Sequence, residues 1–169
     1  MDSSQLRDLI GQKRPRYKAE FRALLESISN KGDSTGMGDF SSFGAFYQTY
    51  MYAFIIGYKI GFPKYIQNSE KTDDFFVFSN WKPTSIREYI IMLLLIKSEE
   101  FGFNWFDLEN ASEDTLDAFV TELIRQMEGY ANTGFEYLKD KWDNENMKFR
   151  HPFVFVDILN EVEVEYPKH

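Results

Sequence analysis

The chain has 169 residues, of which 43% are hydrophobic and 18% aromatic, so it fits one folded domain with a substantial core and excludes wholesale disorder. It contains no cysteine, which excludes disulfides, thiolate nucleophiles and cysteine-ligated metal sites. The net charge of −8 is divided unevenly, with +3 over residues 1–71 and −11 over residues 72–169. This polarity favours electrostatic docking to a partner over uniform binding to nucleic acid.

The N-terminal part predicts two helices separated by a proline. A helix of one or two turns is expected over 4–10, and Pro15 interrupts it because proline lacks the donor that a helix interior needs. We expect residues 1–15 to act as a flexible basic arm. Apolar residues at helical spacing then predict an amphipathic helix over 17–28. The glycine-rich stretch 30–38 predicts a loop.

The next segment, 41–60, predicts a central helix because it is apolar on nearly every side. Residues 40–58 carry no charge, but their hydroxyl and amide side chains are costly in hydrocarbon. We therefore expect a buried helix and no membrane span. Gly57 and Gly61 either permit close contact with another helix or end this one before Pro63.

The middle of the chain leaves one element undecided and predicts one more helix. Residues 75–78 are all apolar and fit either a short strand or a loop that plugs the core. Ser85 begins a capping-box sequence, so we expect a helix that runs to about Glu100. The centre of this helix, 89–96, is expected to be buried core. An aromatic connector follows over 101–110.

The C-terminal part begins with a long helical pattern. Ser112 and the two acids after it favour a helix start, and Gly134 either bends the helix or divides it in two. Residues 153–166 fit either a strand or a last helix. Within them, Val162, Val164 and Tyr166 alternate with glutamates, which favours an edge strand or an extended tail over 160–169.

These segments together predict a mainly α fold. We expect a single-domain helical bundle of about five to six helices over residues 1–169, with room for a short β hairpin or edge strand near the C-terminus. The start of the chain has no basic segment followed by an apolar stretch, so we expect a cytoplasmic protein.

The sequence offers little for catalysis. The two histidines, His151 and His169, belong to no nucleophile motif, and the chain has neither the spacing of a helical di-metal site nor a phosphate-binding glycine loop. We expect no catalytic residue, no metal and no cofactor, which favours a binding protein over an enzyme. A ligand-binding or enzymatic domain with an aromatic pocket around Tyr50 and Tyr130 stays open as an alternative.

Two surfaces are candidates for binding partners. Nucleic acid would be held by the basic stretch after the first helix, with candidate residues Lys13, Arg14, Arg16, Lys18 and Arg22. A larger protein would be held by exposed aromatic side chains, with candidates Phe101, Phe103, Trp105, Phe106 and Trp142. The acidic C-terminal half leaves a third alternative, a protein inhibitor that mimics nucleic acid.

Two stretches stand out for their likeness to other sequences, FYQTYMYAFIIGY (46–58) and RQMEGYANTGFEYL (125–138). They resemble small helical accessory proteins that are encoded beside larger enzymes in bacterial anti-phage and DNA-modification islands. The resemblance implies a non-catalytic accessory or adaptor subunit that binds a larger protein or a protein–DNA complex in phage defence. It assigns no functional residue, and a homo-oligomer is compatible with it.

Overall fold

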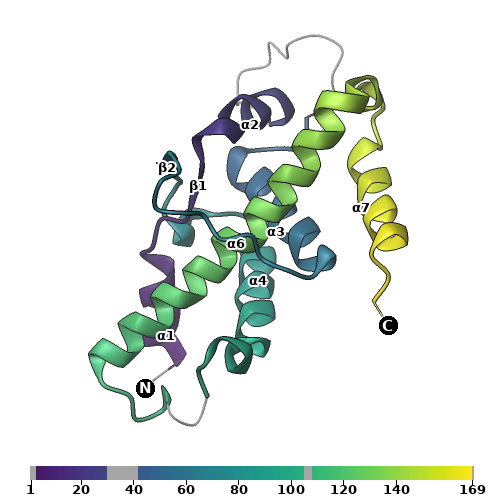
Figure 1. Ribbon diagram of the computed structural model, residues 1–169. Coiled ribbons are helices and arrows are strands. Elements are labelled where there is room, and N and C mark those ends of the chain that lie inside the picture. Colours follow the sequence, from purple (N-terminus) through teal and green to yellow (C-terminus); the bar gives the residue numbers. More distant parts are fainter. Residues whose placement is uncertain (1–2, 30–41, 105–107, 169) are drawn as a thin grey trace.

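The computed structural model describes residues 3–29, 42–104 and 108–168. Its architecture is mainly helical, which confirms the predicted fold class (Figure 1). The elements in chain order are α1 (Ser3–Gly11), β1 (Arg16–Lys18), α2 (Arg22–Ile28), α3 (Phe46–Ile60), β2 (Thr72–Asp74), α4 (Thr84–Ile96), α6 (Glu113–Glu145) and α7 (Val154–Glu165). Short 3-10 turns lie at Ala19–Phe21, Phe78–Asn80, Ser98–Phe101 and Asn146–Arg150. The predicted loop over 30–38 lies outside the described residues, as do Trp105, Phe106 and His169.

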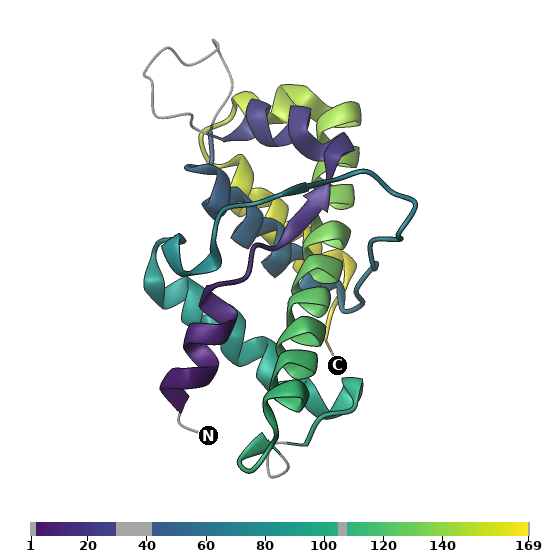
Figure 2. The same cartoon turned by 90° about the vertical axis from the view of Figure 1, so that its left-hand side faces the viewer.

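Helix α6 is the longest helix that the structure describes, and it runs through the middle of the fold. Its 33 residues span about 50 Å at the usual helical rise, and the other helices lie along its length (Figures 1 and 2). Ser112 caps it as predicted, with its hydroxyl accepting a hydrogen bond from the Thr115 amide at 3.3 Å. The helix continues through Gly134, so this glycine does not divide it.

Gly134 instead allows α6 to cross α3 with the two backbones in contact. A Cβ added at Gly134 would lie 1.7 Å from the Ala53 carbonyl oxygen, and one added at Gly57 would lie 1.8 Å from that of Tyr130. No side chain fits on either side of this crossing. Gly57 therefore serves close helix contact, whereas Gly61 ends α3 in a left-handed conformation with φ of 105°.

The helix predicted over 17–28 begins later than expected. Residues 16–18 form β1, which pairs antiparallel with β2 so that Tyr17 lies opposite Asp73. Pro15 favours extended backbone before it, and its carbonyl accepts a hydrogen bond from the Phe75 amide at 2.9 Å. Helix α2 therefore starts only at Arg22. The apolar spacing from Tyr17 onward did not distinguish a continuous helix from a short strand followed by a helical turn.

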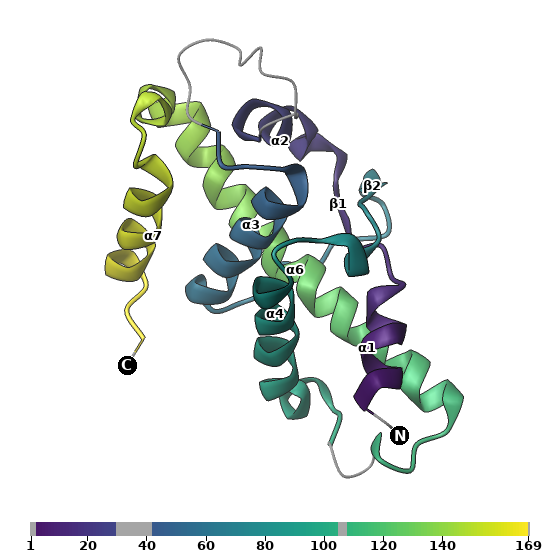
Figure 3. The same cartoon turned by 180° about the vertical axis from the view of Figure 1, so that it is seen from behind.

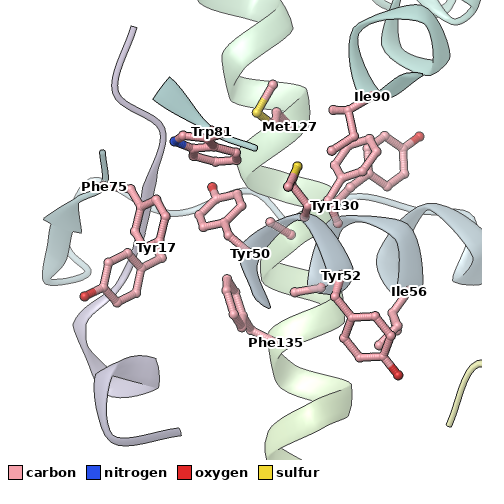
Figure 4. Close-up of a cluster of buried hydrophobic side chains, with 14 of the residues drawn as sticks. Tyr17, Tyr50, Tyr52, Ile56, Phe75, Trp81, Ile90, Met127, Tyr130 and Phe135 are labelled. Atoms are coloured by element: carbon pink, nitrogen blue, oxygen red, sulfur yellow. The ribbon is translucent and has the colours of Figure 1, made fainter. Parts of the chain in front are cut away.

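An aromatic cluster fills the core beside this strand pair (Figure 4). The Tyr50 ring lies 4.9 Å from Trp81, 5.1 Å from Phe75 and 5.4 Å from Phe135, measured between ring centroids. Its hydroxyl donates to the Arg16 carbonyl at 2.7 Å, and burial raises the pKa of the phenol. Residues 75–78 are not a strand: Phe75 and Phe78 are buried, and the segment plugs the core before the 3-10 turn.

The C-terminal segment is helical from Val154 to Glu165, which is the second of the two alternatives predicted for 153–166; the predicted edge strand, and an extended tail over 160–165, are therefore wrong. Its buried residues follow helical spacing: Val154, Phe155, Ile158 and Val162. The backbone of α7 is tied to α3, because the Tyr52 hydroxyl donates to the Phe155 carbonyl at 2.6 Å. The alternation with glutamates misled because Val164 does not pack inward and is 80% exposed.

The predicted N-terminal arm is in part a docked helix. Its residues 3–11 form α1, whose Leu6 and Ile10 side chains are buried against the rest of the core. Across the described parts of the chain, no helix has both the length and the apolar character that crossing a membrane requires.

Candidate functional site

A cleft of about 600 Å³ opens between α3, α4 and the C-terminal segment that follows α7. Figure 3 shows the three helices that border it, with α7 and α4 on either side of the C-terminal half of α3. The cleft is lined by Ile55, Tyr58, Lys59, Tyr89, Leu93, Glu163, Tyr166, Pro167 and Lys168. Apolar and aromatic walls with a few charged groups are typical of binding sites, and this volume lies within their usual range.

The charges around the cleft are mainly positive. Lys168 Nζ lies 4.8 Å from the centroid of the Tyr58 ring. Lys97, which does not line the cleft and forms an ion pair with Glu100, lies 5.5 Å from the Tyr58 ring and 5.9 Å from the Tyr130 ring. Among the described residues that line the cleft, the only carboxylate is that of Glu163, which forms an ion pair with Lys59. A chain with a net charge of −8 therefore presents a locally basic, aromatic cleft.

Local contacts set the ionisation of these groups. Burial raises the pKa of the Tyr58 phenol, and also that of Tyr130. Burial alone would lower the pKa of Lys97, but the neighbouring Tyr130 hydroxyl and Glu100 carboxylate raise it above its ordinary value. The hydrogen bond from Lys59 lowers the pKa of the exposed Glu163 carboxyl.

The described side chains that line the cleft are apolar, aromatic or charged, and Lys59 is held by its carboxylate partner. Within 3–29, 42–104 and 108–168, no group of three or more His, Cys, Asp or Glu side chains is arranged to hold a metal ion. The arrangement offers an apolar seat, aromatic faces and ammonium groups for a carboxylate.

The outer face of α4 continues this surface. Ile86, Tyr89, Met92 and Ile96 are between 39% and 70% exposed, whereas other residues of the same helix are fully buried. The prediction that 89–96 is buried throughout is therefore wrong. Only one side of α4 packs on α3 and α6, so hydrophobicity on both sides of a helix did not mean burial on both sides.

The predicted nucleic-acid residues are mostly engaged by acids of the same chain. Three of the ion pairs are Lys13 with Asp117 at 3.0 Å, Lys18 with Glu70 at 2.7 Å and Arg22 with Asp73 at 3.2 Å. Arg14 is exposed. A phosphate would have to compete with these carboxylates, so the structure adds no support to nucleic-acid binding, which stays a prediction.

Arg16 has a structural role that the sequence did not indicate. Its guanidinium reaches the Glu128 carboxylate at 3.0 Å and 3.2 Å, and its amide donates to the same carboxylate at 2.8 Å. The Glu128 side chain is only 5% exposed, so these three hydrogen bonds satisfy a buried charge on α6. The ion pair and its hydrogen bonds raise the pKa of Arg16.

The predicted partner-binding aromatics are half-buried where the structure describes them. The Phe103 ring packs on Phe119 at 5.0 Å, and the Trp142 ring packs on Phe149 at 5.0 Å. Phe101 is partly buried against the core in the same way. Their ring faces are thus largely used within the fold.

The pocket predicted around Tyr50 and Tyr130 does not coincide with the cleft. Tyr50 has no exposed surface and is enclosed by other rings, and Tyr130 is 3% exposed behind Tyr58. Two features of the sequence could have indicated the cleft. One is the second apolar face of the helix after Ser85, and the other is the pair of lysines near the ends of α3 and α7, Lys59 and Lys168.

Comparison with known proteins finds no matching family, no similar curated protein and no similar solved structure.

Proposed function

We propose that the protein is a non-catalytic adaptor or accessory subunit that binds a larger protein through the cleft between α3, α4 and α7. The observation that carries this proposal is an aromatic cleft bordered by lysines on a chain that is otherwise strongly acidic. Exposed tyrosine, methionine and isoleucine beside it are typical of protein interfaces.

The charges indicate the chemistry of the partner. Lys168 has no carboxylate of the described residues within ion-pair distance and is held only over the Tyr58 ring. The complementary ligand is a protein segment with apolar side chains next to a carboxylate, which would sit between Lys168 and the Lys59–Glu163 pair. Such a segment would seat its apolar side chains against Ile55 on the α3 side of the cleft and against Tyr166 and Pro167 on the α7 side.

The test compares three full-length chains, each tagged and produced in the native host. Wild type is expected to retain one stoichiometric protein partner, and Lys168→Glu is expected to lose it because the reversed charge repels the carboxylate. Lys71→Glu is the matched control, since it makes the same change in net charge on an exposed loop residue away from the cleft. It should retain the partner.

Two outcomes would contradict the proposal. One is a wild-type chain that retains no stoichiometric partner. The other is a Lys168→Glu chain that keeps the partner as well as wild type, with circular dichroism showing that all three chains are folded. A role in anti-phage defence comes only from the resemblance of two short stretches, and it stays a prediction.

A further inference from the structure

The exposed face of α4 forms a narrow apolar stripe. Ile86, Tyr89, Leu93 and Ile96 follow one another at spacings of three, four and three residues, with Met92 beside them. At 100° per residue these positions fall within one third of the helix circumference. This is the spacing at which one helix packs along another. Contiguous exposed apolar surface of this kind marks an interaction site more often than an ordinary monomer surface.

The stripe is self-complementary when two copies run antiparallel. A twofold axis beside Ile91 places Ile86 opposite Ile96 of the second copy and Tyr89 opposite its Leu93. The remaining pairs repeat these contacts in reverse, which is the requirement for an interface between identical chains. Ile96 is the most exposed of these residues, at 70%. In a parallel pair it would contact only Ile96 of the second copy, at one end of the interface.

The charges beyond the stripe favour the same arrangement. Lys82 is exposed just before α4, and Glu99 and Glu100 are exposed just after it. The twofold axis that aligns the apolar residues also brings Lys82 of one copy to the acids of the other, at both ends of the interface. A parallel pair would instead place lysine beside lysine and acids beside acids. The antiparallel helix dipoles add a smaller favourable contribution.

We infer that the outer face of α4 is covered by the same face of a second copy of this chain, in an antiparallel twofold dimer. This inference goes beyond the proposed function, because Lys59 and Lys168 lie on the α3 and α7 sides of the cleft. The second copy would border the cleft at Tyr89 and Leu93, which the stripe and the cleft share.

The first test is the mass of the purified full-length protein by sedimentation and light scattering. Wild type is expected to reach twice the 20.0 kDa of one chain as its concentration rises through the micromolar range. Ile96→Lys should remain monomeric at every concentration. Val164→Lys, which places the same charge on the exposed side of α7, should dimerise like wild type. A wild-type chain that stays monomeric would overturn the inference.

The second test reads the direction of the helices and uses the absence of native cysteine. Ile86→Cys and Ile96→Cys chains are oxidised mildly, separately and as a mixture. The antiparallel dimer predicts a disulfide-linked dimer mainly in the mixture, because residue 86 faces residue 96. Rapid linkage of Ile86→Cys to itself would show a parallel pair and overturn the inference.

The experiments distinguish failure of the docking cleft from failure of the α4 dimer. Loss of the partner from Lys168→Glu with an intact dimer supports the docking cleft, and a monomeric wild-type chain that still binds its partner removes only the dimer. A charge reversal completes the test: Lys82→Glu should weaken the dimer, and adding Glu99→Lys and Glu100→Lys should restore it. Failure of that restoration would contradict the register.

Discussion

Replacing Gly134 by alanine is expected to destabilise the protein strongly, because the backbones of α3 and α6 leave no room for a Cβ at this position. The new methyl carbon would lie 1.7 Å from the Ala53 carbonyl oxygen and 2.5 Å from its carbonyl carbon, and both atoms belong to the backbone of α3. Ordinary contacts of this kind exceed 3 Å, so α3 and α6 would have to separate by more than 1 Å along the crossing. Overpacking of this kind typically costs about 1–3 kcal/mol or more.

The expected net loss takes the helix propensity into account. Alanine favours a helix interior over glycine by about 1 kcal/mol, so a steric cost of about 4 kcal/mol would leave a net loss of about 3 kcal/mol. For a chain of this length that corresponds to a fall of about 6–12 °C in Tm. Urea unfolding followed by circular dichroism and tryptophan fluorescence gives the free energy of unfolding.

Gly102→Ala is the control for the Gly134 prediction. Gly102 has nothing within 4 Å of an added Cβ, but its φ of 93° is unfavourable for alanine. It should therefore lose only about 1–2 kcal/mol. A Gly134→Ala protein as stable as wild type would refute the backbone contact between α3 and α6.

Three further perturbations test the polar contacts. Arg16→Ala should lower the free energy of unfolding by about 2 kcal/mol, because it leaves the buried Glu128 carboxylate with only a backbone donor, and Glu128→Gln in the same chain should recover part of the loss. Tyr52→Phe should cost about 1 kcal/mol in urea unfolding, since it removes the hydroxyl that donates to the backbone of α7. The hydrogen bond from Lys141 lowers the pKa of Glu161, so its stabilising contribution is complete above pH 4.5 and is lost as the pH falls through the lowered pKa. Acid titration of tryptophan fluorescence should show α7 loosening below pH 4.5, and Glu161→Gln should remove that part of the pH dependence.

The main helices were readable from the sequence because apolar periodicity reports directly on packing against one core. The central helix and the long helix after Ser112 are both present. Of the two glycines at their crossing, Gly57 was predicted as a candidate for close helix contact, whereas Gly134 was not. The strand at Tyr17 was missed because three residues at the edge of a helical pattern do not reveal a pairing partner more than 50 residues away.

The site was harder to predict than the fold. The sequence identified aromatic and basic residues as candidates for binding. It does not show which acidic side chains lie next to which basic ones in the folded protein. Arg16 was predicted to bind phosphate, but its guanidinium forms an ion pair with Glu128. Lys168 was not predicted to belong to a site, but its ammonium group lies over the Tyr58 ring. The C-terminal alternation of valine and glutamate predicted a strand because only tertiary packing shows that Val164 faces outward.

Hydrogen–deuterium exchange of the chain alone and in its native complex tests the docking cleft most directly. We expect the bound partner to slow exchange in the last turn of α7 and the C-terminal end of α3, around Glu163 and Lys59, where the cleft-lining lysines lie. Protection confined to residues 13–22, with no change around the cleft, would contradict docking at the cleft and place the partner on the basic stretch instead.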